Sequence, residues 1–204
     1  LAESGAAQEV AALFEAYFEP FVFHLRSTCA IPTPVTDSEL CVSVLRLMTA
    51  TLLDCFATSE TAPSESLRAV EGAFLQAIIW AIGGVTDAHG HRSLDVFFKR
   101  LITGTLAGHE AWTQFVLKNP AYAKAMDNPR ELRTPMPFDE GEIFDFMFSC
   151  EKCIWTPWKE LTPRFVPGPE TKFQDILVPT VDTTRTEWLI EKLVTHGQSV
   201  LVTG

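Results

Sequence analysis

The last thirty residues, 175–204, constrain the fold of this chain more than any other stretch. A short apolar run at 176–178 is closed by Pro179, and a second apolar run occupies 200–202. The residues between these runs place apolar side chains at helical spacing: Trp188, Leu189, Leu193 and Val194. Each outer run is short enough for a buried strand. The stretch therefore predicts a strand, a helix and a second strand.

The ends of this predicted unit carry turn and capping signals. Thr180 or Asp182 can cap the helix, and Gly197 can end it. Gly204 follows the second expected strand, where a phosphate-binding loop would begin. The motif of that loop is G-x-x-x-x-G-K-[ST], and only its first glycine is represented here. Alone, one glycine after one strand fits many turns.

Four amphipathic segments precede this unit, with apolar residues three and four positions apart. Helices are expected at about 6–28, 36–57, 64–83 and 91–106. Short connections between them favour a compact bundle. The third helix is almost wholly apolar over its second half, so we expect it to be the central, buried one. The residues expected in the core are Phe74, Ile78, Leu94, Phe97 and Phe98.

Local signals refine the boundaries of the first two helices. Pro20 lies within the first apolar pattern and predicts a kink or a restart near Glu19, because proline has no N–H to donate. Thr36 and Glu39 match a capping box at the start of the second helix.

The second half of the chain is less regular until a predicted hairpin. Residues 109–134 are interrupted by prolines and are expected to form a surface excursion. Residues 142–148 and 154–158 predict two β-strands, the second of them short or at an edge because of Pro157. Trp155 and Trp158 are expected to anchor this hairpin to the bundle, with partners for their indole N–H groups.

Charge and hydropathy exclude several kinds of partner. The formal net charge is −10 at pH 7 and no basic run occurs, so neither nucleic acid nor an anionic membrane surface is expected as a partner. No apolar stretch is long enough to span a bilayer. With 47% apolar residues, the chain has enough material for a real core.

The five cysteines do not form a recognisable metal or redox motif. Cys150 and Cys153 make a single C-x-x-C, without two further ligands at zinc spacing and in an expected hairpin turn. The other three lie in helical apolar patterns: Cys29, Cys41 and Cys55. We expect reduced, buried thiols of a cytosolic protein and no bound metal.

Several phrases resemble dynein heavy chains. The sequence V-P-T-V-D-T-T-R-T at 178–186, followed by a helix, H-G and V-L-V-T-G, closely resembles the start of their third AAA+ module. F-L-Q-A-I-I-W-A-I-G-G at 74–84, with Arg92-x-x-Leu-Asp-x-Phe-Phe, is similar to the small helical domain of their second module. Residues 143–147 and W-T-P-W at 155–158 resemble the hairpin that follows. The resemblance covers most of the chain after residue 67.

This resemblance implies a mainly α architecture. A helical AAA+ lid bundle would be followed by a β-hairpin and by the first strand–helix–strand of a P-loop α/β module. Residues 1–165 would form the lid, or small domain, of the second AAA+ module with its hairpin. Residues 166–204 would form a linker and the N-terminal part of the third module's large domain. In AAA+ rings a lid closes over its own nucleotide and packs against the next large domain.

The resemblance also implies a function. The chain would be part of an ATP-driven motor that moves towards microtubule minus ends, with ATP or ADP and Mg²⁺ bound in the intact parent. Its partners would be neighbouring AAA+ modules, and, through other parts of the parent, microtubules and dynein intermediate and light chains. The form of the 178–186 phrase favours an axonemal heavy chain, hence the cytoskeleton of a cilium or flagellum.

Candidate nucleotide contacts follow from the resemblance. The adenine pocket would involve the strand edge formed by Leu177, Val178, Pro179 and Thr180. Gly204 would begin the phosphate loop, and Arg68 could reach a γ-phosphate. Leu177 and Val178 also fit as plain core residues, and Arg68 as a solvated arginine. Neither the lysine of the phosphate loop nor a Walker B acid pair is present, so we name no catalytic residue and do not expect this chain to hydrolyse ATP alone.

Two alternatives remain at the level of sequence. One is a non-enzymatic helical scaffold or adaptor with no nucleotide. The other is a fragment of a different giant AAA+ ATPase such as midasin. A glycine-rich loop ending in Gly-Lys-Ser or Gly-Lys-Thr after Gly204 would favour an AAA+ protein over the scaffold.

Overall fold

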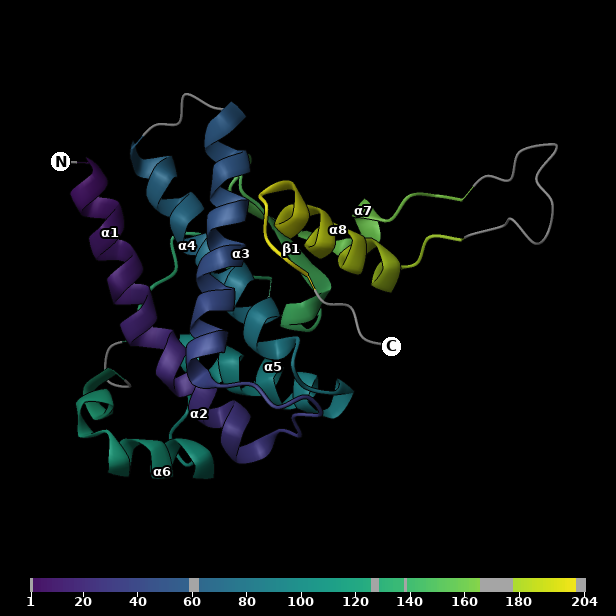
Figure 1. The fold of residues 1–204 in the computed structure, drawn as a ribbon. Helices are drawn as coiled ribbons and strands as arrows, with labels where there is room; N and C mark the ends of the chain where they lie inside the picture. Colours follow the sequence, from purple (N-terminus) through teal and green to yellow (C-terminus); the bar gives the residue numbers. More distant parts are fainter. Residues whose placement is uncertain (1, 59–62, 126–128, 138, 166–177, 201–204) are drawn as a thin grey trace.

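The structure is a computed structural model that describes residues 2–58, 63–125, 129–137, 139–165 and 178–200. Within the helices, only the backbone is described at residues 2–4, 57–58, 63–66 and 124–125. The described helices pack as a bundle, with a small hairpin and a final helix laid against one side (Figure 1).

The first helical segment is continuous but changes its winding. Helix α1 spans Ala2–Leu13, a π-helical turn spans Phe14–Phe18, and α2 spans Glu19–Thr28. Pro20 lies at the start of α2 and has no N–H to give the preceding turn. The wider π turn accommodates that missing hydrogen bond. The predicted irregularity near Glu19 is confirmed, as a π turn within an unbroken helix.

Helices α3, α4 and α5 form the rest of the bundle. Helix α3 (Asp37–Thr58) begins with the predicted capping box: Glu39 N–H donates to Thr36 Oγ1 at 3.3 Å, and Thr36 N–H donates to Glu39 Oε2 at 2.7 Å. Helix α4 spans Pro63–Gly83, and α5 spans Ala88–Thr103. The sequence placed the start of α5 three residues too late, because Asp87 caps it by accepting a hydrogen bond from Gly90 N–H.

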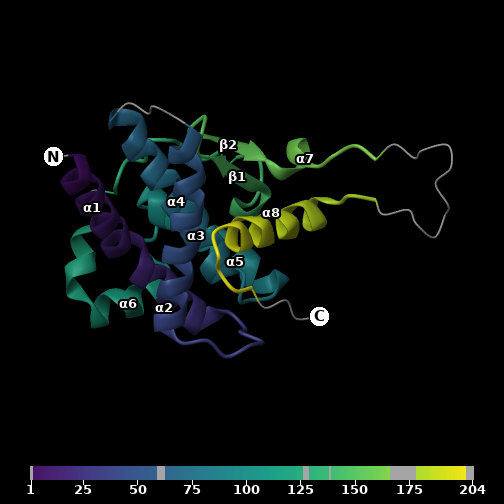
Figure 2. The same ribbon diagram turned by 45° about the horizontal axis from the view of Figure 1, so that its top comes forward.

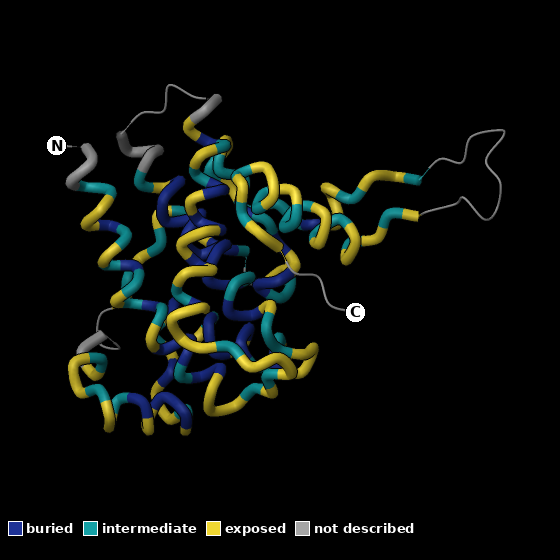
Figure 3. Tube along the Cα trace, viewed as in Figure 1, coloured by how far each residue is buried: buried dark blue, intermediate teal, exposed yellow. Residues whose placement is uncertain are grey.

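Helix α4 is the central element, as predicted. Its second half is enclosed by neighbours and contributes an unbroken run of buried residues (Figure 3). All five predicted core residues are at most 1% exposed: Phe74, Ile78, Leu94, Phe97 and Phe98. Phe74 also meets the ring of Phe14 edge-on, with ring centroids 5.1 Å apart.

The segment after α5 is only partly the surface excursion that was expected. Helix α6 (Glu110–Lys118) buries Trp112 and Phe115 against the core, and a 3₁₀ helix follows at Pro120–Ala125. The expectation is therefore wrong for α6. The prolines that suggested an irregular loop lie outside this helix, whose two aromatic residues sit three positions apart on one face.

The hairpin differs in detail from its prediction. A 3₁₀ turn at Ile143–Asp145 precedes β1 (Phe146–Ser149), which pairs antiparallel with β2 (Ile154–Pro157). The pairing runs from Phe146 opposite Pro157 to Ser149 opposite Ile154. Trp158 is not in the strand but begins the short helix α7 (Trp158–Leu161).

Two glycines of α4 receive the hairpin. A methyl group at Gly72 would collide with the ring of Phe148, and one at Gly83 would collide with the ring of Phe144. Phe148 N–H also donates to Gln76 Oε1 at 2.9 Å. The absence of side chains at two points on one face of α4 thus lets the aromatic residues of the hairpin region approach its backbone closely.

The predicted anchoring by tryptophan is confirmed, but the predicted hydrogen bonds are not. Trp158 is 1% exposed, and the half-buried Trp155 packs beside Phe148 with ring centroids 5.2 Å apart. Neither indole N–H has an acceptor among the described residues. Both rings are held by other aromatic rings instead.

Helix α8 (Val181–Thr195) is the described part of the predicted strand–helix–strand unit. Thr180 caps it: its Oγ1 accepts from Thr183 N–H at 3.1 Å. Gly197, with φ of 69°, follows its end. The two predicted strands lie mostly outside the described residues; of their members, Val178 and Val200 are described and are not in strands.

A search of the described helices for a membrane span found none of sufficient length and apolarity.

Replacing Phe74 by alanine should lower the free energy of unfolding by about 3–5 kcal/mol, because a fully buried aromatic ring is removed from a tightly packed site. Chemical denaturation of the purified chain measures this change. The matched control is Leu117→Ala, since Leu117 is 76% exposed and its removal should change stability by less than about 0.5 kcal/mol. Equal effects of the two substitutions would contradict the assigned core.

Candidate functional site

Helix α8 lies against the bundle beside α3 and α7, and both views agree on this placement (Figures 1 and 2). No residue of α8 is fully buried, yet three of its apolar side chains pack against the core: Trp188, Leu189 and Leu193. We call the contact of α8 with α3, α4, α7 and the hairpin region the α8 junction.

Three tryptophans connect α4 to α8 within this junction. The rings of Trp80 on α4 and Trp158 on α7 meet edge-on, with centroids 6.2 Å apart. Trp158 in turn meets Trp188 of α8 edge-on at 5.6 Å. Trp158 therefore links the central helix to α8 through aromatic contacts.

Asp54 of α3 fixes the C-terminal end of α8. It pairs with Lys192, and His196 Nε2 lies 2.7 Å from its other carboxylate oxygen. Burial alone would raise the pKa of Asp54, but the hydrogen bonds and charges of Lys192 and His196 outweigh burial and lower this pKa below its usual value. Asp54 is thus an ionised carboxylate that bonds to two side chains one turn apart.

Arg185 fixes the other end of α8. Its guanidinium pairs with Asp182, lies 5.6 Å from the ring centroid of Trp80, and donates to the backbone oxygen of Phe144 at 3.5 Å. The helix is thereby held to the lid bundle at both ends, by Arg185 and by the Asp54 pair.

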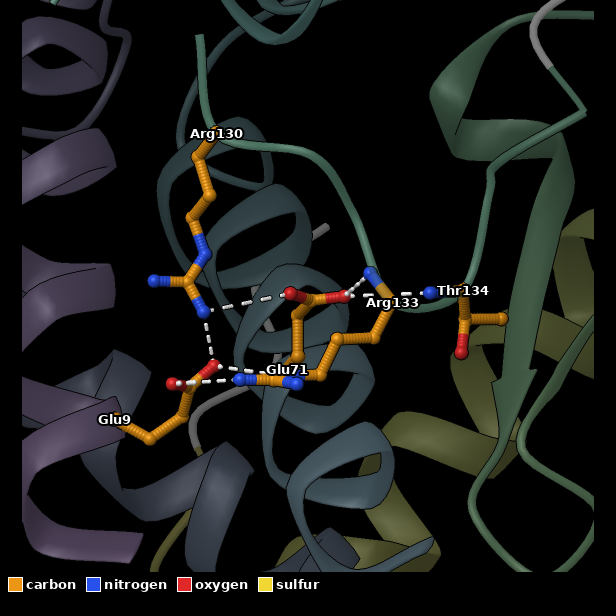
Figure 4. A network of polar contacts seen from close by, with 5 residues as sticks. All are labelled: Glu9, Glu71, Arg130, Arg133 and Thr134. Carbon is orange, nitrogen blue, oxygen red and sulfur yellow. Dashed lines mark hydrogen bonds and ion pairs between the residues drawn. The ribbon is translucent and has the colours of Figure 1, made fainter. Parts of the chain in front are cut away.

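A second polar network ties the segment after α6 to the bundle (Figure 4). Glu71 of α4 is fully buried, and its Oε1 accepts from the backbone N–H groups of Arg133 at 2.7 Å and Thr134 at 3.4 Å. Arg130 reaches both Glu71 and Glu9 of α1, and Arg133 also pairs with Glu9. We call this set the Glu71 network.

The charge state of Glu71 reflects two opposing effects. Burial raises its pKa, while the two backbone N–H groups and the charge of Arg130 limit the rise. Tyr17 lies near the same charges, and burial together with Glu71 and Glu9 raises its pKa to about 12. The network is therefore a desolvated polar site between α1, α4 and the segment that follows α6.

The histidines that were searched for ligand spacing have structural surroundings. His24 is 2% exposed, lies 2.9 Å from Ser93 Oγ and stacks on Phe97. Burial, with the nearby His109, lowers the pKa of His24 to about 4, so it is neutral at pH 7. Among the described residues, no group of three His, Cys, Asp or Glu side chains is arranged to hold a metal ion.

The candidate nucleotide contacts lie in two separate places. Arg68 is exposed on α4, whereas Val178, Pro179 and Thr180 precede α8 at the other side of the bundle (Figures 1 and 2). Val178 is 52% exposed, so the described structure does not place it in the core. Leu177 and Gly204 lie outside the described residues.

Sequence reasoning missed the residues that build both polar sites. Asp54, Lys192 and His196 are far apart in the chain, and no spacing rule links them. Glu71 stood within an expected core helix, where a charged residue every turn or so is usually solvated. Its position between buried residues 69–70 and 73–75 was the one available signal that it lies inside.

Comparison with known proteins assigns the chain to a family. Residues 10–160 match the dynein heavy chain AAA lid domain. The chain belongs to the dynein heavy chain family. Residues 165–204 match a second dynein family, the P-loop containing dynein motor region. The α8 junction therefore joins a dynein lid domain to the beginning of a dynein P-loop region, and the chain is part of a dynein motor. The scaffold and midasin alternatives are not favoured.

Individual dynein heavy chains are similar over most of the chain. Dynein axonemal heavy chain 10 of Homo sapiens is 31% identical over 172 residues, 84% of this chain and 3% of that protein. Dynein axonemal heavy chain 11 of Sus scrofa is 28% identical over 193 residues, 94% of this chain and 4% of that protein. The chain thus spans only a few per cent of the length of these relatives.

Replacing Glu71 by alanine should lower the free energy of unfolding by about 3–5 kcal/mol, because Arg130 and two backbone N–H groups lose their buried partner. Glu71→Gln should cost less, since the amide oxygen still accepts from both N–H groups. Thermal and urea unfolding measure these changes. Glu131→Gln, an exposed acid beside Arg130, is the control and should have almost no effect. If alanine and glutamine at position 71 behave like the control, the network does not contribute to stability.

Proposed function

We propose that this chain couples the nucleotide state of two adjacent AAA+ modules in an ATP-driven dynein motor that moves towards microtubule minus ends. In this proposal residues 1–165 are the lid of the second module, and residues 166–204 begin the large domain of the third. The observation that carries the proposal is the α8 junction, where a helix of the P-loop region is held by the lid domain at both ends.

The position of α8 in the chain gives the coupling a physical route. Residues 178–180 lie directly before α8, and the apolar run at 200–202 lies directly after its end. Both are proposed to border the nucleotide of the third module. A displacement of the lid that moves α3 and α7 would carry α8 with it, through Asp54 and Trp158. The adenine side and the phosphate side of that nucleotide would then shift together.

The proposed cofactor is ATP or ADP with Mg²⁺ in the intact parent. Its adenine would contact the segment formed by Leu177, Val178, Pro179 and Thr180, and its phosphates would lie at a loop beginning at Gly204. Arg68 would serve the nucleotide of the preceding module. The exposure of Arg68 and Val178, and their location on different sides of the bundle, support two separate nucleotide positions.

The proposed partners lie outside this chain. They are the neighbouring AAA+ modules of the same heavy chain and, through other parts of the parent, microtubules and intermediate or light chains. The similar proteins named axonemal and the ciliary dynein β chain of Tripneustes gratilla support a location in the axoneme of a cilium or flagellum.

The α8 junction can be tested in a longer fragment of the parent that also contains the complete third module. Asp54→Ala should release Lys192 and His196 and change the affinity of that module for a fluorescent ATP analogue by about 5-fold or more, the lower range of typical allosteric coupling. Equilibrium titration gives the affinity, and Trp188 fluorescence reports whether α8 has moved.

Asp37→Ala is the matched control, because Asp37 is also on α3 and in an ion pair, with Arg26, but far from α8 in the sequence of that helix. It should leave the affinity unchanged. If Asp54→Ala displaces α8 without altering nucleotide affinity, the junction does not couple the two modules.

A further inference from the structure

Three cysteine side chains meet at the hairpin turn beside α8. Cys55 Sγ of α3 lies 3.3 Å from the backbone oxygen of Cys150, and Cys153 Sγ lies 3.5 Å from the same oxygen. The Cys55 thiol is also in hydrogen-bonding contact with the Cys150 thiol. The C-x-x-C of the turn therefore has a third thiol nearby, from a helix 95 residues earlier in the chain.

The backbone of the turn contributes to this arrangement. Cys153 has φ of 52°, and among the described residues it is the single non-glycine residue with positive φ. A left-handed conformation is disfavoured for cysteine, so the surrounding contacts must hold it. It directs the end of the turn so that Cys153 Sγ faces the Cys150 carbonyl.

The thiols border a cavity at the α8 junction. A space of about 250 Å³ is lined by Cys55, Cys150, Trp188 and Lys192, among others. Cys55 is 3% exposed, while Cys150 is half-buried. The cavity gives a small reagent access to Cys150, and Cys55 is already in contact with that thiol.

We propose that Cys55 and Cys150 form a reversible disulfide in the presence of a small-molecule disulfide, and that this bond fastens α3 to the hairpin turn beside the Asp54 pair. The bond requires the two sulfur atoms to approach to about 2 Å, and they start in contact. The proposal concerns this chain's own thiols and stands independently of the proposed coupling between modules.

The chemistry is thiol–disulfide exchange in two steps. The Cys150 thiolate attacks one sulfur of oxidised glutathione, which forms a mixed disulfide and releases one glutathione thiolate. Cys55 then gives up its proton to solvent and attacks Cys150 Sγ, which releases the second glutathione. Two cysteine thiols lose two electrons and two protons, and one oxidised glutathione becomes two reduced glutathione molecules.

The surroundings of Cys150 set the rate of the first step. Burial, the Cys55 thiol and Cys153 raise the pKa of Cys150, while Lys192 opposes them. The other charged groups at this place are Asp54 and His196, which bind each other, and Glu151 of the turn. Because little thiolate exists at pH 7, the reaction should be slow there and accelerate about tenfold per pH unit between pH 7 and 9.

The test is to incubate the 204-residue chain with oxidised glutathione, block the remaining thiols, and map the peptides by mass spectrometry. We expect two of the five thiols to disappear, a peptide linking Cys55 to Cys150, and a higher melting temperature that dithiothreitol reverses. Cys41→Ser, outside the cluster, is the control and should behave as the unmodified chain does.

Two variants separate the steps. Cys55→Ser should stop at the mixed disulfide on Cys150, and Cys150→Ser should form neither product. Because Cys55 is buried and its serine variant can unfold, the half-buried Cys150 gives a second, safer test. A Cys150–Cys153 linkage, glutathione adducts alone in the unmodified chain, or five unreacted thiols at pH 9 would overturn the proposal.

Discussion

The close approach of the hairpin region to helix α4 positions the rest of this structure. Gly72 and Gly83 leave two gaps on one face of α4, and the rings of Phe148 and Phe144 fill them. Gln76, between the glycines, accepts from the backbone of Phe148 at 2.9 Å. The hairpin region is therefore held both by shape and by a buried hydrogen bond, at a fixed height along the central helix.

Everything beyond the hairpin inherits its position from this contact. The end of β2 leads directly to Trp158, whose ring lies between Trp80 of α4 and Trp188 of α8. Asp54 then fixes the far end of α8 to α3. On the opposite side, the Glu71 network ties α4 to the segment after α6. A dynein lid built this way holds a helix of the P-loop region through α4 and α3, which are both core elements.

The sequence predicted those parts of the fold that local chemistry decides. The apolar spacing located α3, α4 and α8, the Thr36–Glu39 box located the start of α3, and the wholly apolar run from Phe74 identified the central helix. The start of α5 was misplaced because Asp87 was not recognised as its cap. The hairpin was located, but its first residues form a 3₁₀ turn and Trp158 begins a helix.

The candidate site was less predictable, because its contacts join distant parts of the chain. Asp54 meets Lys192 across 138 positions, and Glu71 meets Arg133 across 62. No periodicity marks such pairs; only tertiary packing brings them together. The same holds for Cys55, without which the C-x-x-C turn has no third thiol. The nucleotide contacts came from resemblance to dynein heavy chains and remain proposals, with Leu177 and Gly204 outside the described residues.

The most direct measurement of this account is hydrogen exchange in the 204-residue chain, with and without Gly72→Ala. The added methyl group should displace Phe148, because it would occupy the position of that ring. If the hairpin positions α8, the amides of β1, β2 and α8 should all exchange faster in the variant, while those of α2 and α5 keep their protection. An α8 that is unprotected in the unmodified chain, or unchanged by the substitution, would contradict the account.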